Sequence, residues 1–60
     1  MRYFSCAIFD SRDRTPTRSF IVASDEVRAR VLARSELVRT HASLYAEVRE
    51  GERLVCIERI

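Results

Sequence analysis

Few side chains in this sequence are of the types that carry out chemistry, and their spacing keeps them apart. Cys6, His41 and Cys56 are the candidate nucleophiles and metal ligands, but they lie on separate predicted elements without the spacing of a metal site. The single glycine, Gly51, excludes a glycine-rich phosphate loop and a Gly-x-Ser-x-Gly nucleophile elbow. We therefore predict a protein that is not an enzyme, with no catalytic residue, metal, cofactor or small-molecule substrate.

The arginines are the other residues with chemical meaning. All 11 basic residues are Arg, and nine acidic residues bring the net charge to +2. An arginine-only set is typical of phosphate or carboxylate recognition, although GC-rich coding produces it as well. The dispersed pattern favours coding bias, because a nucleic-acid site needs a one-sided basic patch. The candidates for such a patch are three arginines at a predicted loop and three on a predicted helix: Arg12, Arg14, Arg18, Arg28, Arg30 and Arg34.

Length and composition set the class of protein. Residues 1–60 are predicted to form a single compact domain, which buries only about 60% of the surface that the unfolded chain exposes. With 47% apolar residues, a globular fold is expected rather than disorder. No apolar run approaches the ~20 residues of a membrane span and no signal-peptide pattern is present, so we expect a cytoplasmic protein. A reducing compartment would keep Cys6 and Cys56 as free thiols.

The first half of the chain predicts a long-looped antiparallel hairpin. Residues 2–9 alternate with period two and carry apolar groups on both faces, which is typical of a central strand. Polar residues and a proline over 10–17 predict a loop, which is a candidate recognition loop because it exceeds the usual hairpin length. A second strand follows over 18–23. We expect Phe4 and Phe20 in the core, with Tyr3, Phe9 and Ile21 on the far face.

A helix is predicted to begin after the second strand. Ser24 is the expected N-cap, and acidic residues follow it at the positive end of the helix dipole. The apolar face of this helix is expected to carry Val27, Val31 and Val38, with Leu37 beside them. At 100° per residue the candidate arginines Arg30 and Arg34 share one side while Arg28 lies apart, so a helix seated in a DNA groove has little support.

The segment 40–50 fits two interpretations. In the first, one helix covers 25–50 and aligns Leu37, His41, Leu44 and Val48, which gives a ββαβ fold with a long or broken helix. In the second, the helix ends near residue 40 and a strand follows. Length favours the second interpretation, because a helix over 25–50 would measure about 39 Å and overhang strands of about 20–23 Å.

We therefore predict a small α+β domain of ββαββ type, with an antiparallel sheet and one helix packed on one face. The last two strands, over 43–49 and 53–58, form a hairpin with a turn at Glu50-Gly51. This turn pairs Leu44 with Ile57, Ala46 with Val55, and Arg49 with Glu52. Because Glu-Gly is not the preferred turn dipeptide, the register has an uncertainty of one residue.

One helix can cover only one face of a four-stranded sheet, so an apolar open face is expected around Tyr3 and Phe9. Such patches usually mark an interface. We predict a small protein-binding module, a regulator or inhibitor that docks on a larger protein or forms a homodimer. Small size and lack of catalytic motifs also suggest a phage or mobile-element accessory protein of anti-defence type. The alternative is an arginine-dependent nucleic-acid-binding protein, in which exposed aromatics stack on bases.

Overall fold

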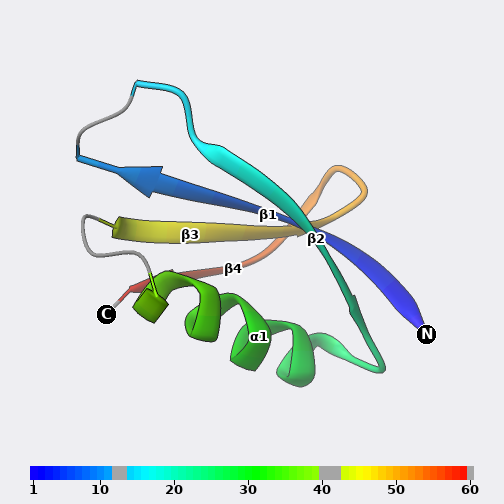
Figure 1. The fold of residues 1–60 in the computed structure, drawn as a ribbon. Coiled ribbons are helices and arrows are strands. Elements are labelled where there is room, and N and C mark those ends of the chain that lie inside the picture. The colour runs from blue at the N-terminus through cyan, green and yellow to red at the C-terminus, as the bar shows by residue number, and fades with distance from the viewer. Residues whose placement is uncertain (12–13, 40–42, 60) are drawn as a thin grey trace.

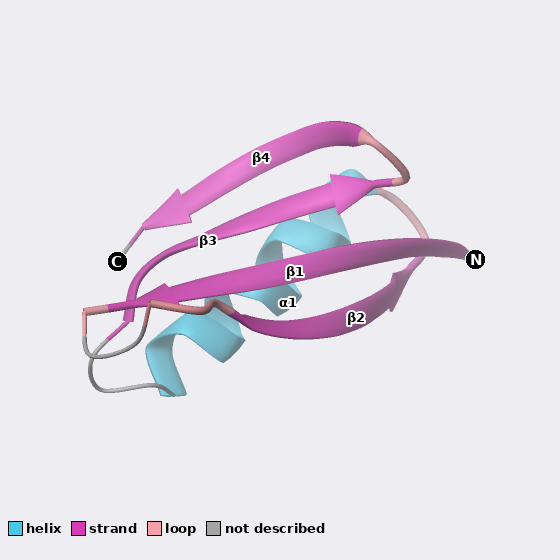
Figure 2. Cartoon of the chain, turned by 90° about the horizontal axis from the view of Figure 1, so that it is seen from above, coloured by secondary structure: helices cyan, strands magenta, loops and turns pink. Residues whose placement is uncertain are grey.

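A computed structural model describes residues 1–11, 14–39 and 43–59, and for 43 and 44 the backbone only. The chain runs through β1 (Arg2–Asp10), β2 (Thr17–Ala23), α1 (Glu26–Arg39), β3 (Ser43–Glu50) and β4 (Arg53–Arg59). The strands form one antiparallel sheet in the order β2-β1-β3-β4, with α1 across one face (Figures 1 and 2). The predicted ββαββ fold is confirmed. The alternative long helix is wrong, because α1 ends at Arg39 and residues 43–50 form a strand.

The central strand β1 decides which side chains face the helix. Phe4 pairs with Ile21 of β2, and Cys6 pairs with Val48 of β3, so all four side chains lie on the helix-covered face and are buried. The prediction that Phe20 fills the core and Ile21 faces away is wrong. Alternation along 18–23 separates the two residues correctly, but only pairing with β1 fixes which of them points inward. Phe20 therefore lies on the uncovered face.

The helix packs through small residues rather than through its valines. Ala29, Ala33 and Leu37 are completely buried. The expected face of Val27, Val31 and Val38 is wrong, since these three side chains are exposed on the outer side of α1. The bulky side chains of the sheet fill the core, so the two alanines allow α1 to lie close to the strands.

The β3–β4 hairpin turns one residue later than predicted. Glu50 pairs with Arg53, which leaves Gly51 and Glu52 as the two turn residues. Gly51 has a φ of 62°, a left-handed conformation that glycine adopts without strain at the first central position of a hairpin turn.

The predicted pairs in this hairpin are accordingly wrong, and a register shift changes them further. Arg49 lies opposite Leu54, whereas Val48 lies opposite Cys56, so Val55 is the extra residue of a β-bulge. Val55 and Cys56 both pack against the core. The bulge thus lets two successive residues of β4 contact the core.

The helix begins with an aspartate cap instead of the expected serine. The Asp25 carboxylate accepts a hydrogen bond of 2.8 Å from the backbone N–H of Arg28, and the Asp25 carbonyl accepts one of 3.1 Å from Ala29. This is the geometry of an N-cap residue one position before the helix. Ser24 lies one residue too early to cap a helix that starts at Glu26.

Replacing the cap is expected to destabilise the fold measurably. Asp25→Ala leaves the backbone N–H of Arg28 without its acceptor and should lower the free energy of unfolding by about 1 kcal/mol. Ser24→Ala is the matched control and should change the free energy of unfolding by only a few tenths of the loss expected for Asp25→Ala. Urea unfolding followed by circular dichroism measures both variants. Equal losses would contradict the assignment of Asp25 as the cap.

Candidate protein interface on the open face of the sheet

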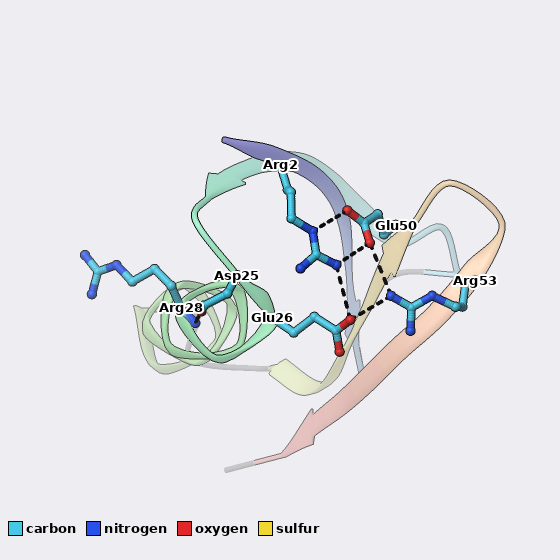
Figure 3. A network of polar contacts seen from close by, with 6 residues as sticks. All are labelled: Arg2, Asp25, Glu26, Arg28, Glu50 and Arg53. Carbon is cyan, nitrogen blue, oxygen red and sulfur yellow. Dashed lines mark hydrogen bonds and ion pairs between the residues drawn. The ribbon is translucent and has the colours of Figure 1, made fainter.

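A cluster of four charged residues fixes one end of the sheet against the start of the helix (Figure 3). The Arg2 guanidinium donates from Nε and Nη2 to the two carboxylate oxygens of Glu50, at 2.8 and 2.6 Å, and from Nη2 to Glu26 at 3.2 Å. Arg53 Nη2 donates to Glu26 at 2.7 Å and to Glu50 at 3.2 Å. The cluster therefore joins β1, α1, β3 and β4 at a single point.

The hydrogen bonds of this charge cluster lower the pKa of both of its carboxylates, Glu26 and Glu50. Hydrogen bonds from Arg2 lower the pKa of Glu50 from 4.5 to about 2, with a smaller contribution from Arg53. Hydrogen bonds from Arg53 and then Arg2 lower the pKa of Glu26. The Arg2 guanidinium also lies over the Phe4 ring, 5.3 Å from its centroid, and so covers one end of the core.

The face of the sheet opposite α1 carries most of the exposed apolar side chains of the strands. Phe20 is 85% exposed and Tyr3 is 72% exposed, and the pairing of β1 with β2 places Val22 directly opposite Tyr3. Leu54 and Ile57 continue this face on β4 and are also exposed. Helix α1 lies on the opposite face and does not cover these five side chains. We call the group of Tyr3, Phe20 and Val22 the β1–β2 patch.

A shallow hollow lies within the β1–β2 patch. It has a volume of about 300 Å³ and is lined by Tyr3, Phe4, Ser5, Phe20 and Gly51. The small Ser5 side chain is opposite Phe20, so the two exposed aromatic rings stand around a low point. A hollow beside two aromatic side chains can accept one apolar side chain of a partner, which is the usual form of an interface anchor site.

The other aromatic residues of the open face are engaged with each other. The rings of Phe9 and Tyr45 stack with centroids 4.6 Å apart and an angle of 16° between their planes. The guanidinium of Arg59 lies over the Tyr45 ring at 5.2 Å from its centroid. Tyr45 thus contacts Phe9 and Arg59. The predicted interface residue Phe9 is therefore part of a packed stack, whereas the predicted Tyr3 is open.

The predicted arginines do not gather on one surface. Arg14 is exposed in the β1–β2 loop, and Arg18 lies on the open face opposite Ala7. Arg28 is exposed at the start of α1. Arg30 pairs with Glu58 at 3.7 Å, and Arg34 donates to the carbonyl of Arg59 at 2.8 Å, so both reach from α1 to β4. Arg12 and the candidate His41 fall outside the described residues.

Sequence reasoning missed Phe20, Val22 and Ile57 as members of the open face. The period-two alternation of the strand does place Phe20 and Val22 on the same face. Choosing their face required the pairing of Phe4 with Ile21, which no local pattern encodes. Ile57 lies opposite Glu47 because of the bulge in β4, and a bulge leaves no clear signal in the sequence.

The thiols and carboxylates offer little reactive chemistry. Cys6 and Cys56 are free cysteines, and burial raises the pKa of both thiols, which keeps them protonated near neutral pH. Within residues 1–11, 14–39 and 43–59, no group of three or more His, Cys, Asp or Glu side chains is placed to hold a metal ion. The described part of the chain also contains no helix long and apolar enough to span a membrane.

Comparisons with protein-family models, with curated proteins and with solved structures found no match for this chain.

The charge cluster is expected to make stability depend on acid pH. The lowered pKa of Glu50 means that its contribution is complete above pH 4.5 and is lost as the pH falls towards about 2. The urea midpoint of the wild type should fall over this interval. Glu50→Gln should have a lower midpoint at pH 7 and a smaller further loss in acid.

Glu52→Gln provides the control for this titration. Glu52 is exposed in the same turn, and no ion pair joins it to another described residue. Its urea midpoint should follow that of the wild type at every pH. A Glu50→Gln profile that parallels the wild type between pH 4.5 and 2 would contradict the role of Glu50.

Proposed function

We propose that this chain is a non-enzymatic protein-binding module that docks on a larger protein as a regulator or inhibitor. The observation that carries the proposal is the β1–β2 patch, where Tyr3 and Phe20 stand exposed beside Val22 on the face opposite α1. Exposed aromatic residues of this kind are enriched at the energetic centres of protein interfaces.

The chemistry around the patch indicates the kind of partner. Arg18 lies on the open face of β2, and Arg49 lies opposite Ser5 on β3, so basic groups flank the apolar centre on two sides. Arg49 is paired with Glu47 at 3.7 Å, whereas no ion pair joins Arg18 to another described residue. The surface therefore suits an apolar anchor side chain with acidic neighbours, since buried anchors and complementary rim charges provide affinity and specificity.

The alternative of nucleic-acid binding has weaker support. Tyr3, Phe20 and Arg18 resemble the ingredients of a base-stacking platform. However, six arginines make ion pairs or hydrogen bonds within the fold, so they are not arranged as a phosphate-binding stripe: Arg2, Arg30, Arg34, Arg39, Arg49 and Arg53. Tyr45 also contacts Phe9 and Arg59 rather than standing open. The origin in a phage or mobile element stays a prediction.

A pull-down comparison of matched variants tests the proposal. Tagged wild-type protein should retain one stoichiometric protein from native lysate, and nuclease treatment should not remove it. Tyr3→Ser should reduce recovery at least tenfold, because an aromatic anchor contributes about 2 kcal/mol or more. Val38→Ser removes an apolar side chain, 62% exposed, from the outer side of α1 and should bind as the wild type does.

Three outcomes would count against this function. Equal losses for Tyr3→Ser and Val38→Ser would show that binding follows general hydrophobicity rather than the patch. Recovery of nucleic acid alone, with affinity that falls steeply with salt, would favour the arginine-dependent alternative. The absence of any stoichiometric protein under native conditions would leave the open face without a partner and would overturn the proposal.

A further inference from the structure

We propose that the edge strand β2 pairs antiparallel with β2 of a second copy of this chain, centred on Phe20, to form a continuous eight-stranded sheet. This inference concerns the edge of the sheet and goes beyond the proposed docking of a partner on the open face. It comes from the difference between the two edge strands, since the order β2-β1-β3-β4 leaves one side of β2 and one side of β4 without a neighbouring strand.

The edge at β4 carries features that prevent further pairing. A β-bulge at Val55 interrupts the regular ladder, and Arg34 from α1 donates a hydrogen bond to the carbonyl of Arg59. Arg30 reaches from the same helix to Glu58. Bulges and charged side chains at an edge are the devices by which sheets avoid adding another strand.

The edge at β2 has no bulge and no contact from a helix arginine, and Arg18 is its one charged residue. Its seven residues pair with β1 without a register shift, from Ala23 opposite Arg2 to Thr17 opposite Ile8. Among the described residues no side chain donates to the backbone of β2 in the way that Arg34 bonds to β4. A regular strand with the apolar sequence Phe20 to Ala23 and one free side is a ready template for strand addition.

The sequence of β2 matches itself in antiparallel register. A twofold axis through Phe20 places Phe20 opposite the partner's Phe20, Arg18 opposite the partner's Val22, and Ser19 opposite the partner's Ile21. Phe20, which is 85% exposed in the single chain, then gains an aromatic neighbour on the same face. Aromatic side chains that lie directly opposite each other on neighbouring antiparallel strands stabilise a sheet.

The groove between β2 and α1 supplies the second contact surface. It has a volume of about 420 Å³, and its lining includes Ser19, Ile21, Leu32, Ser35, Glu36 and Arg39. The end of α1 that leads to β3 extends past the β2 side of the sheet in Figure 2. The same twofold axis therefore brings the end of α1 of each copy towards the groove of the other copy. Glu36 and Arg39, which pair with each other at 3.4 Å, lie at this contact, so it carries both charges in each copy.

The dimer would combine with the proposed function instead of blocking it. Antiparallel pairing within one sheet keeps both helices on one side and both open faces on the other. The two β1–β2 patches then lie next to each other across the axis, with one hollow in each copy. A partner with two matching anchors would gain affinity by engaging both.

Cysteine cross-linking tests the register of this dimer in the purified protein without any partner. Phe20→Cys should form a covalent dimer under mild oxidation, because directly opposite residues have Cβ atoms about 4.5–5.5 Å apart. Arg18→Cys and Val22→Cys should each stay largely uncross-linked alone but should cross-link when mixed. The wild type, with its native Cys6 and Cys56, is the control for background oxidation.

Charge reversal at the axis provides an independent test by sedimentation equilibrium. Phe20→Glu and Phe20→Lys each place like charges opposite each other and should raise the dimer dissociation constant at least tenfold. An equimolar mixture should restore dimers, because opposite charges then meet across the axis. Tyr3→Ser, which removes the open-face anchor, should dimerise as the wild type does, so failure of docking and failure of dimerisation are separable.

Several results would overturn the proposal. A wild type that sediments as a monomer at millimolar concentration would exclude the dimer. Cross-linking of Val22→Cys alone at the level of Phe20→Cys would exclude this register. A mixture of Phe20→Glu and Phe20→Lys that remains monomeric would show that Phe20 does not lie on the axis.

Discussion

The structure depends on the close packing of one short helix against one face of a four-stranded sheet. Ala29 and Ala33 are completely buried, so the helix can lie near the strands while Phe4, Val48 and Leu37 fill the space between the two layers. All buried groups of this core cluster belong to that single interface. Residues 1–11, 14–39 and 43–59 form no second helix that covers the other face, where Tyr3, Phe20, Val22, Leu54 and Ile57 remain exposed. The same constraint thus produces both the stability of the fold and its apolar surface.

Arginine has a structural role in this small fold that its frequency alone does not reveal. Arg2 and Arg53 bind the carboxylates of Glu26 and Glu50, which come from distant points of the chain, and Arg2 also covers the Phe4 ring. Planar guanidinium groups can bridge two carboxylates in a fixed geometry, which a lysine cannot do as well. Arg30 and Arg34 similarly connect the helix to the last strand. Much of the basic character that suggests a nucleic-acid partner is therefore used to hold the four strands and the helix together.

Local patterns in the sequence predicted the kind and order of the elements but not the contacts between them. Period-two alternation over 2–9 and 18–23, and the length of a helix that a short sheet can accommodate, were enough to predict ββαββ. Alternation has no absolute direction, so it does not decide which of Phe20 and Ile21 faces the helix, whereas the pairing of Ile21 with Phe4 does. Helical spacing suggested a valine face, because it cannot anticipate that small alanines permit closer packing. The exposure of Tyr3 was predictable from its position on a central strand with two apolar faces, whereas the contact between Arg2 and Glu50 joins residues 48 positions apart.

The two edge strands of the sheet, β4 and β2, differ in how easily another strand can pair with them. On β4, a bulge interrupts the regular ladder, Arg34 binds the backbone carbonyl of Arg59, and Arg30 pairs with the Glu58 side chain. Such protection has a cost, since the bulge gives up ladder hydrogen bonds and the arginines lose side-chain freedom. On β2 the chain keeps a regular strand, apolar from Phe20 to Ala23, and an adjoining groove on the helix side. An unprotected edge of this kind exposes a small protein to aggregation unless it is covered. Covering it with a second copy in a closed twofold arrangement ends strand addition at eight strands, because the only edges that remain are the protected ones at β4.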